Sequence, residues 1–334
     1  MYSKSKTFFS DRKNLMKSKK YQLFDTTKLE SIRTSKFRDG SDSAKKLRLY
    51  AERLDKIGYM RELVQAPAIS ALAKLERDMP NFSEVIIFVR RQIALSRLGP
   101  AGERAMGMLP ILLEGSPGIG KTRFVQQLAK ALRVEFHEIS FATTTATFVL
   151  KGGSLQWGEG QAGRIFDILA DCAHMNPMVL LDEIDKFLTG NYSPVNVLYE
   201  VLEPNQAKRF QDEALGDVHL DASRIMWVLT ANEPRLIPAA IISRCRVFDI
   251  PEPTKEQMRR VAQSVYRDVL VGQPWAFKFE RMLRVDVVNK LYAMAPREIR
   301  KVIMDGLGWA AERGLNRITP DSIPELDKSK KIGF

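Results

Sequence analysis

The sequence predicts an α/β fold with a five-stranded parallel sheet, an N-terminal helical segment and a C-terminal helical lid. Between residues 109 and 251, short apolar runs alternate with helical stretches, which is typical of a parallel sheet covered by helices. Apolar residues recur at helical spacing before this region and again after it. We expect the five strands at residues 110–113, 134–139, 178–181, 225–229 and 247–250.

The length and composition indicate a globular protein with room for more than one domain. The chain has 334 residues, of which 45% are hydrophobic and 28% are charged, which argues against global disorder and against a fibrous chain. Its two cysteines, Cys172 and Cys245, are too few and too far apart for a metal framework or a disulfide scaffold. No apolar run approaches the roughly 20 residues of a membrane span. We therefore expect no membrane span and a cytoplasmic location.

The positive charge is concentrated near the N-terminus. The net charge is +12, and residues 1–50 contribute +9 of it, with 14 Lys or Arg against 5 Asp or Glu. We expect residues 1–42 to form a basic, flexible arm that contacts nucleic acid, an anionic membrane or an acidic partner. A solvated tail without any partner is the other open interpretation.

Three segments follow this arm. Residues 43–99 carry apolar residues at every third or fourth position and should form three helices. A break between two of them is expected at Met79-Pro80, because proline disfavours helical geometry in the residue before it. Residues 100–251 contain the predicted sheet. After two further prolines, residues 252–334 return to the helical pattern, and we expect a small lid domain there.

A glycine-rich motif joins the first predicted strand to a helix. It has the form G-x-x-x-x-G-K-[ST], and its place between a strand and a helix is the context in which this motif binds nucleotide phosphates. Backbone N–H groups that turn inward at a helix N-terminus attract anions. Lys121 would reach the β- and γ-phosphates of ATP, and the Thr122 hydroxyl would ligate Mg²⁺. The predicted phosphate site comprises Gly115, Ser116, Pro117, Gly118, Ile119, Gly120, Lys121 and Thr122.

Polar residues follow two more of the buried strands. The run 178–181 leads into Asp182 and Glu183, at the strand end where ligands bind in open α/β sheets. Asp182 would hold Mg²⁺ through water, and Glu183 would orient and deprotonate the attacking water. Asn232, after the next apolar run, would help to position that water, although a role in turning the chain stays open. Together these residues predict Mg-dependent ATP hydrolysis.

These motifs, in this order, resemble the AAA+ ATPases and, in detail, the ATPase module of Lon-type proteases. The resemblance extends from about residue 44 to residue 325. It implies an AAA+ nucleotide-binding domain at residues 100–251, a homo-oligomeric and hexameric ring, and a protein as the substrate. The residues that carry it are Asn176-Pro177, Leu181 to Lys186, Glu203 to Gln206, Thr230 to Asn232, Ile237-Pro238 and Ile241 to Arg244.

The resemblance alone implies roles for several arginines. Arg244 matches the arginine finger, which in a ring reaches the γ-phosphate bound by the neighbouring subunit, and Arg246 is a second candidate for this role. Arg297 matches the lid arginine that senses nucleotide in its own subunit, and Arg300 is the alternative one helical turn later. A surface ion pair is the competing interpretation of Arg244 and Arg246.

The segment from Lys151 to Arg164 matches the pore-loop region of the family. Trp157 stands where the family places an aromatic residue that grips the threaded polypeptide, although Gly158 and Glu159 depart from the usual aliphatic-glycine pair. Tryptophan is more often a core or interface residue, so a structural role competes with this one. The glycines around Trp157 predict an exposed, mobile loop.

Two departures from the family shape the functional hypothesis. The sequence stops at Phe334, directly after the predicted lid, so that we expect no Ser-Lys protease domain and no intrinsic peptidase activity. The large N-terminal substrate domain is replaced by the short basic arm. The leading hypothesis is a ring that uses ATP hydrolysis to remodel or unfold a protein, alone or for a separate protease. The alternatives are a nucleic-acid-associated ATPase that uses residues 1–42, and a non-catalytic scaffold switched by nucleotide.

Overall fold

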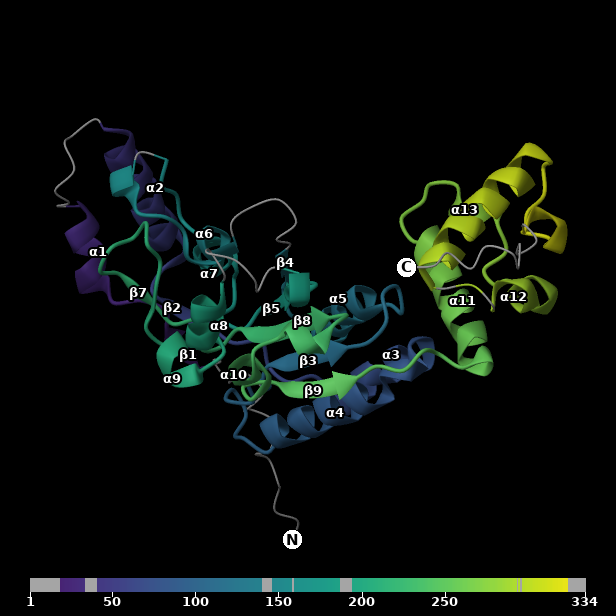
Figure 1. Cartoon of the computed structure of the whole chain (residues 1–334), viewed down its shortest axis with the longest axis horizontal. Coiled ribbons are helices and arrows are strands. Elements are labelled where there is room, and N and C mark those ends of the chain that lie inside the picture. The colour runs from purple at the N-terminus through teal and green to yellow at the C-terminus, as the bar shows by residue number, and fades with distance from the viewer. Residues whose placement is uncertain are drawn as a thin grey trace, which may run out of the picture.

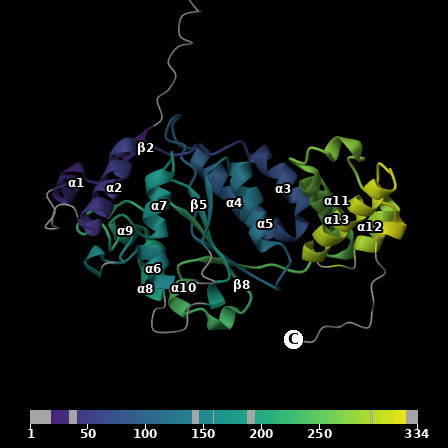
Figure 2. The same ribbon diagram turned by 90° about the horizontal axis from the view of Figure 1, so that it is seen from above.

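In the computed structural model of the chain, an α/β body is followed by a helical lid (Figure 1). The structure describes residues 19–33, 41–139, 146–157, 159–186, 194–292, 294 and 296–323. The body and the lid lie side by side along the longest axis of the molecule, as both ribbon views show (Figures 1 and 2).

The body is built on a five-stranded sheet with the order β4-β5-β8-β3-β9. Every neighbouring pair in this sheet is parallel. The predicted sheet is therefore confirmed, and each strand end falls within two residues of its expected place. The strands are β3 (Ile111–Glu114), β4 (Phe136–Ile139), β5 (Met178–Leu181), β8 (Met226–Ala231) and β9 (Arg246–Asp249).

Both faces of the sheet are covered by helices, which explains its uninterrupted apolar strands. All residues of β5 and β8 are buried, as expected for parallel strands packed on both sides. Side chains alternate between the faces, so that Ile111 and Leu113 join one core cluster and Leu112 joins the other. One face packs against α3 (Ala73–Asp78), α4 (Ser83–Arg97) and α5 (Lys121–Leu132), and the other against α7 (Arg164–Asp171) and α8 (Val195–Val201).

The N-terminal segment is folded where the structure describes it. Strand β1 (Lys20–Gln22) pairs antiparallel with β2 (Met60–Glu62), and helix α1 (Thr26–Arg33) follows before α2 (Asp42–Ile57). The expected flexibility of residues 1–42 is therefore wrong for residues 19–33. The reason is that Leu23, Phe24 and Leu29 are each 3% exposed or less, and this burial fixes the segment despite its many basic residues. Residues 1–18 and 34–40 lie outside the described residues.

Short elements complete the body on the side of α2. They include a small antiparallel hairpin that the apolar pattern did not predict, because its strands have only two residues each. These elements are α6 (Ala146–Lys151), α9 (Pro204–Ala207), β6 (Phe210–Gln211), β7 (His219–Leu220) and α10 (Ala239–Ile242).

The lid has a core of its own, built from α11 (Lys255–Leu270), α12 (Val285–Leu291) and α13 (Pro296–Glu312). Helix α11 begins with a capping box in which Thr254 and Gln257 exchange side-chain to backbone hydrogen bonds. Two ion pairs join the lid to the body: Arg267 with Asp78 at 2.5 Å and Arg123 with Asp268 at 2.8 Å.

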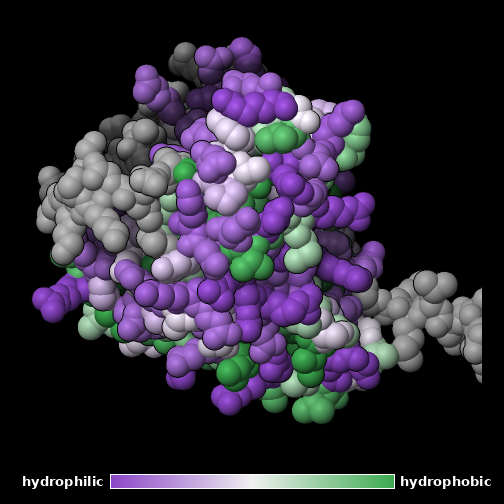
Figure 3. All heavy atoms as spheres, turned by 90° about the vertical axis from the view of Figure 1, so that its right-hand side faces the viewer, coloured by the Kyte–Doolittle hydropathy of each residue, from purple (hydrophilic) through white to green (hydrophobic). Residues whose placement is uncertain are grey.

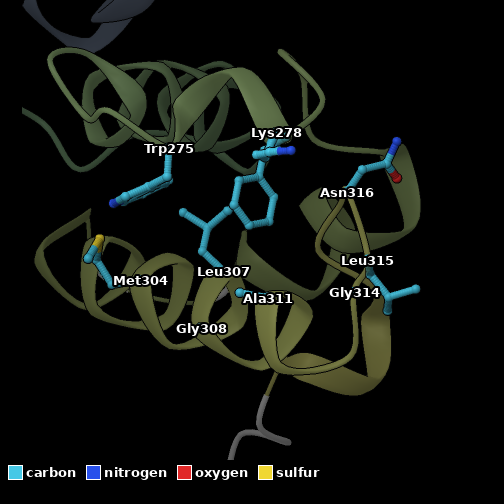
Figure 4. Close-up of a pocket in the computed structure, with 10 residues that line it drawn as sticks. Trp275, Lys278, Met304, Leu307, Gly308, Ala311, Gly314, Leu315 and Asn316 are labelled. Carbon is cyan, nitrogen blue, oxygen red and sulfur yellow. The ribbon is translucent and has the colours of Figure 1, made fainter.

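A cavity of about 750 Å³ lies within the lid. Figure 4 shows Trp275 and Leu307 facing it from opposite sides, and Lys278 is the one charged residue in its lining. The space-filling view of the lid side shows a largely hydrophilic surface with hydrophobic residues in small groups (Figure 3). Because this cavity is mainly apolar and contains no residue of the glycine-rich motif, it is a poor site for a triphosphate.

Within the described residues, no helix is long and apolar enough to cross a membrane.

Candidate nucleotide-binding site

The carboxyl ends of β3, β5 and β8 meet at one edge of the sheet and open into a cleft of about 370 Å³. Residues from four parts of the chain line this cleft: the segment before α4, the glycine-rich motif, the polar residues after β5 and β8, and the lid. Its body residues include Pro117, Gly118, Ile119, Gly120, Lys121, Thr122, Asp182, Glu183 and Asn232, and its lid residues include Val261, Val265, Asp268, Arg297 and Arg300.

The glycines of the motif occupy backbone positions that other residues rarely adopt. Gly118 has φ 83° and Gly120 has φ 101°, both in the left-handed region that favours glycine. Gly115 has φ 146°, and a Cβ atom there would lie 2.7 Å from the carbonyl oxygen of Ile250. The motif can therefore bring its backbone N–H groups around a phosphate only with glycine at these places.

Lys121 begins α5 and is held in the floor of the cleft. Its side chain is nearly buried, and Nζ donates to the carbonyl oxygens of Gly115 and Ser116 and to Oδ1 of Asn232 at 2.6, 3.2 and 2.7 Å. Burial lowers the pKa of Lys121, and the nearby carboxylates, Asp182 foremost, raise it in partial compensation. The lysine and Asn232, both predicted from motifs 111 residues apart, are thus in direct contact.

A chain of hydroxyl and carboxylate groups crosses the cleft beside Lys121. The Thr122 hydroxyl donates to Oδ2 of Asp182 at 2.9 Å, and the buried Thr230 hydroxyl donates to the other oxygen, Oδ1. Thr230 also accepts a hydrogen bond of 2.8 Å from the backbone N–H of Glu183. Through this network β8 fixes both carboxylate-bearing residues that follow β5.

The donor set of Thr122 and Asp182 fits Mg²⁺. This ion prefers oxygen ligands and is commonly bound by one or two protein groups, with waters and substrate phosphates completing its shell. No group of three or more His, Cys, Asp or Glu that could hold a metal occurs among the described residues. At this edge of the sheet, Thr122 and Asp182 would supply the protein oxygen ligands, and the phosphates of a bound nucleotide would supply others.

Glu183 has a strained backbone and a partly exposed carboxylate. Its φ is 56°, a conformation that costs a residue with a side chain free energy and that recurs at functional sites. Its carboxylate pairs with Lys186 at 2.5 Å, and its side chain is 45% exposed. The next acid, Asp185, is buried and accepts hydrogen bonds from the backbone N–H groups of Asn232 and Glu233. Asp185 therefore fixes the turn that presents Asn232.

The arginines that the resemblance implied divide into two groups. Arg297 and Arg300 of α13 line the cleft of their own chain. Arg244 does not line it: its Nη1 donates to the Ala240 carbonyl at 2.7 Å and its guanidinium stacks on Tyr199 at 5.2 Å. Arg246 is exposed and lies 5.7 Å from the ring of Phe248. Among the described residues, Nε of Arg244 is buried without a hydrogen-bond partner.

Six lining residues were missed by motif reasoning, and two of them, Arg123 and Asp268, form the ion pair between body and lid. Met79 and Asn81 reach the cleft from the loop before α4, and Val261 and Val265 reach it from α11. The side chain of Asn81 donates to the Pro251 carbonyl at 3.3 Å. Such apolar walls with a few polar groups suit the flat base of a nucleotide. The spacing of the valines, one helical turn apart, was a usable signal, but only the fold shows which face of α11 turns toward the motif.

The described residues on the two sides of the glycine-rich segment around Trp157 pack against each other. Trp157 ends a short 3-10 helix (Leu155–Trp157), and its side chain lies outside the described residues. The N–H of Gly153 donates to the Gln161 carbonyl at 2.9 Å. A Cβ atom on Gly163 would lie 2.4 Å from the Leu150 carbonyl oxygen. Glycine is required here because two backbone segments pack closely.

Comparison with known proteins also indicates an ATPase domain around this cleft. Residues 111–251 match the model of the ATPase family associated with various cellular activities (AAA). The mitochondrial Lon protease homolog of Phaeodactylum tricornutum is 31% identical over 231 residues, 67% of this chain and 25% of the relative. Lon protease 1 of Thermus thermophilus is 30% identical over 238 residues, 70% of this chain and 30% of the relative. The chain thus spans about a quarter to a third of the length of these two relatives.

Solved structures include a weaker likeness. The RuvB Holliday junction branch migration motor of Thermotoga maritima superposes with a TM-score of 0.44 at 14% identity, over 77% of this chain and 67% of that one. At this score and identity the likeness says nothing about what the present chain does. The family match and the Lon relatives together show that residues 111–251 belong to the AAA family of ATPases. The similarity to Lon proteases extends beyond these residues.

Proposed function

We propose that this chain hydrolyses ATP with Mg²⁺ in a subunit-spanning site and uses the energy to remodel or unfold a protein. The observation that carries the ATPase part is the contact network of Lys121, Thr122, Asp182, Glu183 and Asn232 at one edge of the sheet. Each member has a chemical task in phosphoryl transfer to water, and all five line one cleft.

The residues of the cleft divide the work of hydrolysis. The backbone N–H groups of the motif and the Lys121 ammonium bind the β- and γ-phosphates. The phosphate oxygens then replace the carbonyl and amide oxygens to which Lys121 now donates. Mg²⁺, held by Thr122 and Asp182, would neutralise charge on the phosphates. Glu183, released from Lys186, takes the proton of the attacking water, and Asn232 orients that water.

The position of Arg244 favours a site shared between subunits. It lies outside its own cleft, so it cannot reach the γ-phosphate bound there without a large movement, whereas a neighbour in a ring could receive it. A planar guanidinium in this role raises phosphoryl-transfer rates by about 10³ to 10⁵. We propose a homo-oligomeric ring, of the hexameric type implied by the Lon resemblance, with Arg244 as the finger, Arg297 as the lid sensor in cis, and Arg246 and Arg300 as the respective alternatives.

The loop containing Trp157 supports a polypeptide as the substrate. Beside it lies a cavity of about 810 Å³, lined by Phe148, Lys151, Glu159, Glu213 and backbone of the glycine-rich segment. The side chain of Phe148 is 51% exposed, so an apolar surface and two acidic groups are available next to the loop. An extended peptide offers apolar and basic side chains that such a surface can bind.

The test is the ATPase rate with and without a permanently unfolded protein. Addition of the unfolded protein to the wild-type chain should raise the rate severalfold, and Trp157→Ala should abolish this increase but keep the basal rate. Trp157→Tyr is the matched control and should retain stimulation, because another aromatic side chain can grip the polypeptide. A wild-type rate that ignores unfolded protein at every concentration would rule out protein remodelling.

The charge of the N-terminal segment favours a second candidate, a nucleic-acid-associated ATPase. The excess of +9 in residues 1–50 would bind phosphates in a strongly salt-dependent manner. Removal of residues 1–18, which carry five Lys or Arg against one Asp and so +4 of this excess, should then weaken duplex binding and reduce its salt dependence. This deletion spares the folded β1. Failure of the full-length chain to bind duplex DNA or RNA at low salt would eliminate this candidate.

We also propose that the chain has no peptidase activity of its own, because every motif identified in it belongs to the ATPase module. Degradation of an unfolded fluorescent substrate by the purified chain with ATP would contradict this.

A further inference from the structure

Helix α2 presents a row of hydrogen-bonding side chains to the glycine-rich loop, defined here as the described residues 153–157 and 159–161. Ser43, Lys46, Tyr50 and Arg53 follow one another at intervals of three or four residues and therefore share one face of the helix. In both ribbon views α2 lies beside α7, which follows the loop, at the end of the molecule away from the lid (Figures 1 and 2).

Three of these side chains bind the backbone of the loop and of the residue after it. Oγ of Ser43 donates to the Leu155 carbonyl at 2.7 Å, and Nζ of Lys46 donates to the Gly160 carbonyl at 2.8 Å. The Tyr50 hydroxyl accepts a 3.1 Å hydrogen bond from the N–H of Ala162. These bonds join residues more than a hundred positions apart, at both arms of the loop.

Arg53 and Tyr50 fasten the same face of α2 to helix α7. Arg53 pairs with Asp167 and Asp171, each at 2.9 Å, and its guanidinium lies 5.0 Å from the ring of Phe166. The ring of Tyr50 packs edge-on against Phe166 at 5.3 Å. The face of α2 that binds the loop is therefore fixed against α7 by ion pairs and ring contacts.

The opposite side of the loop is held by Asp212. This buried carboxylate accepts hydrogen bonds from the N–H groups of Gly163 and Ala214 at 2.8 and 2.9 Å. The adjacent residue, Glu213, donates its N–H to the Lys151 carbonyl at 2.8 Å. Asp212 and Glu213 thus attach Gly163 and Lys151, which flank the loop, to the β6–β7 hairpin.

The N-terminal segment touches this hairpin as well. The N–H of Asp221 donates to the Leu23 carbonyl at 2.7 Å, and Phe24 forms an isolated antiparallel bridge with Leu220. Leu23 and Phe24 therefore pack against the β6–β7 hairpin, next to Asp212.

We propose that α2 is the positioning element of the substrate-gripping loop: Ser43, Lys46 and Tyr50 set the position of residues 153–157 and 159–161, with Asp212 as the opposing anchor. This rests on the proposed function insofar as the loop grips protein. The three residues bind loop backbone and are positioning residues, because none of them is required to touch the substrate.

The first experiment measures hydrogen–deuterium exchange of the full-length chain over residues 150–163. Tyr50→Phe keeps the ring on Phe166 and removes only the hydroxyl, and Lys46→Ala removes only the bond to Gly160. Exchange in this stretch should accelerate about 5- to 10-fold in each variant, the value of one hydrogen bond. Lys45→Ala is the matched control, since Lys45 is exposed and pairs with Asp42 on its own helix. Exchange rates equal to wild type in both variants would overturn the tether.

The second experiment measures the concentration of unfolded protein that gives half-maximal ATPase stimulation. It should rise about 5-fold or more in Lys46→Ala and Tyr50→Phe, while the rate without protein stays within about twofold of wild type. Lys46→Arg, which preserves a charged donor, should restore the wild-type value. Faster exchange with an unchanged half-stimulating concentration would overturn the positioning role. If wild type is not stimulated at all, the proposed protein substrate is wrong, and the positioning role falls with it while the exchange result still stands.

Discussion

Thr230 shows how one buried hydroxyl organises the hydrolytic residues. It donates to Asp182 and accepts from the backbone N–H of Glu183, and it is fully buried. Glu183 holds a left-handed backbone conformation, which is unfavourable for a residue with a side chain unless neighbouring groups stabilise it. The Thr230 hydroxyl supplies such stabilisation directly next to the strained residue.

Thr230→Val should therefore lower ATP hydrolysis about tenfold or more. The substitution keeps the shape of the side chain but leaves the Glu183 N–H and one oxygen of Asp182 without their partner, which costs about 1 to 3 kcal/mol. Steady-state hydrolysis of purified variants measures the effect. Thr230→Ser, which keeps the hydroxyl, should stay near the wild-type rate, and a fully active Thr230→Val chain would contradict the role of this hydroxyl.

Glu183→Gln should reduce ATP hydrolysis about 10²-fold or more, because an amide cannot take the proton of water. Nucleotide binding should persist, since Lys121 and the glycine-rich motif are unchanged. Fluorescent ATP titration alongside the hydrolysis assay separates the two effects. The matched variant Lys121→Ala should lose binding as well, and similar nucleotide affinities for the two variants would argue against this division of roles.

At the scale of elements, local patterns predicted the sheet well and the loops poorly. The strands were predictable because burial on both faces of a sheet requires a short run of apolar residues. The phosphate motif was predictable because its turns require glycine at fixed spacings. The close packing of Gly152, Gly160 and Gly163 was not predicted, because glycine occurs both in mobile loops and in tightly packed backbones. The contact of Lys121 with Asn232 likewise depends on strand order, which no local pattern contains.

Asp212 makes the attachment of the glycine-rich loop dependent on pH. Burial, the main cause, raises its pKa from 3.8 to about 7, and the two N–H donors lower it only in part. The folded state thus binds the proton of Asp212 more tightly than the unfolded state does. The contribution of this proton to the free energy of unfolding is complete below pH 3.8 and is lost as the pH rises to about 7.

The stability of wild type relative to Asp212→Asn should therefore fall between about pH 4 and about pH 7, by at most about 4 kcal/mol. Above this window the difference should level off. Urea unfolding of both proteins across the range, compared at each pH, cancels the contribution of all other carboxylates. A difference that stays constant with pH, or grows as the pH rises, would contradict the raised pKa.

At the scale of the whole molecule, residues 19–33 of the expected basic arm belong to the body. Its composition suggested a solvated arm, because basic residues dominate any average over residues 1–42. The fold of residues 19–33 depends instead on Leu23, Phe24 and Leu29, whose partners lie far along the chain and are invisible to local reasoning. The same limit applies to the cleft, where Val261 and Val265 of the lid meet the phosphate motif only in three dimensions.

The cleft of one chain holds every proposed catalytic group except Arg244, and this makes assembly part of the ATPase account. Glu183→Gln and Arg244→Ala chains should each be nearly inactive alone. When the two are co-expressed, a neighbouring pair can combine the intact Glu183 of one with the intact Arg244 of the other. Random mixing in a head-to-tail ring places this pair at about one interface in four.

The most direct measurement is the ATP hydrolysis rate of the co-assembled Glu183→Gln and Arg244→Ala chains. Recovery to about a quarter of the wild-type rate, against near-zero rates for each variant alone, is the expected result. No recovery in assemblies shown to contain both chains, or a wild-type rate for Arg244→Ala by itself, would contradict a site completed by the neighbouring subunit.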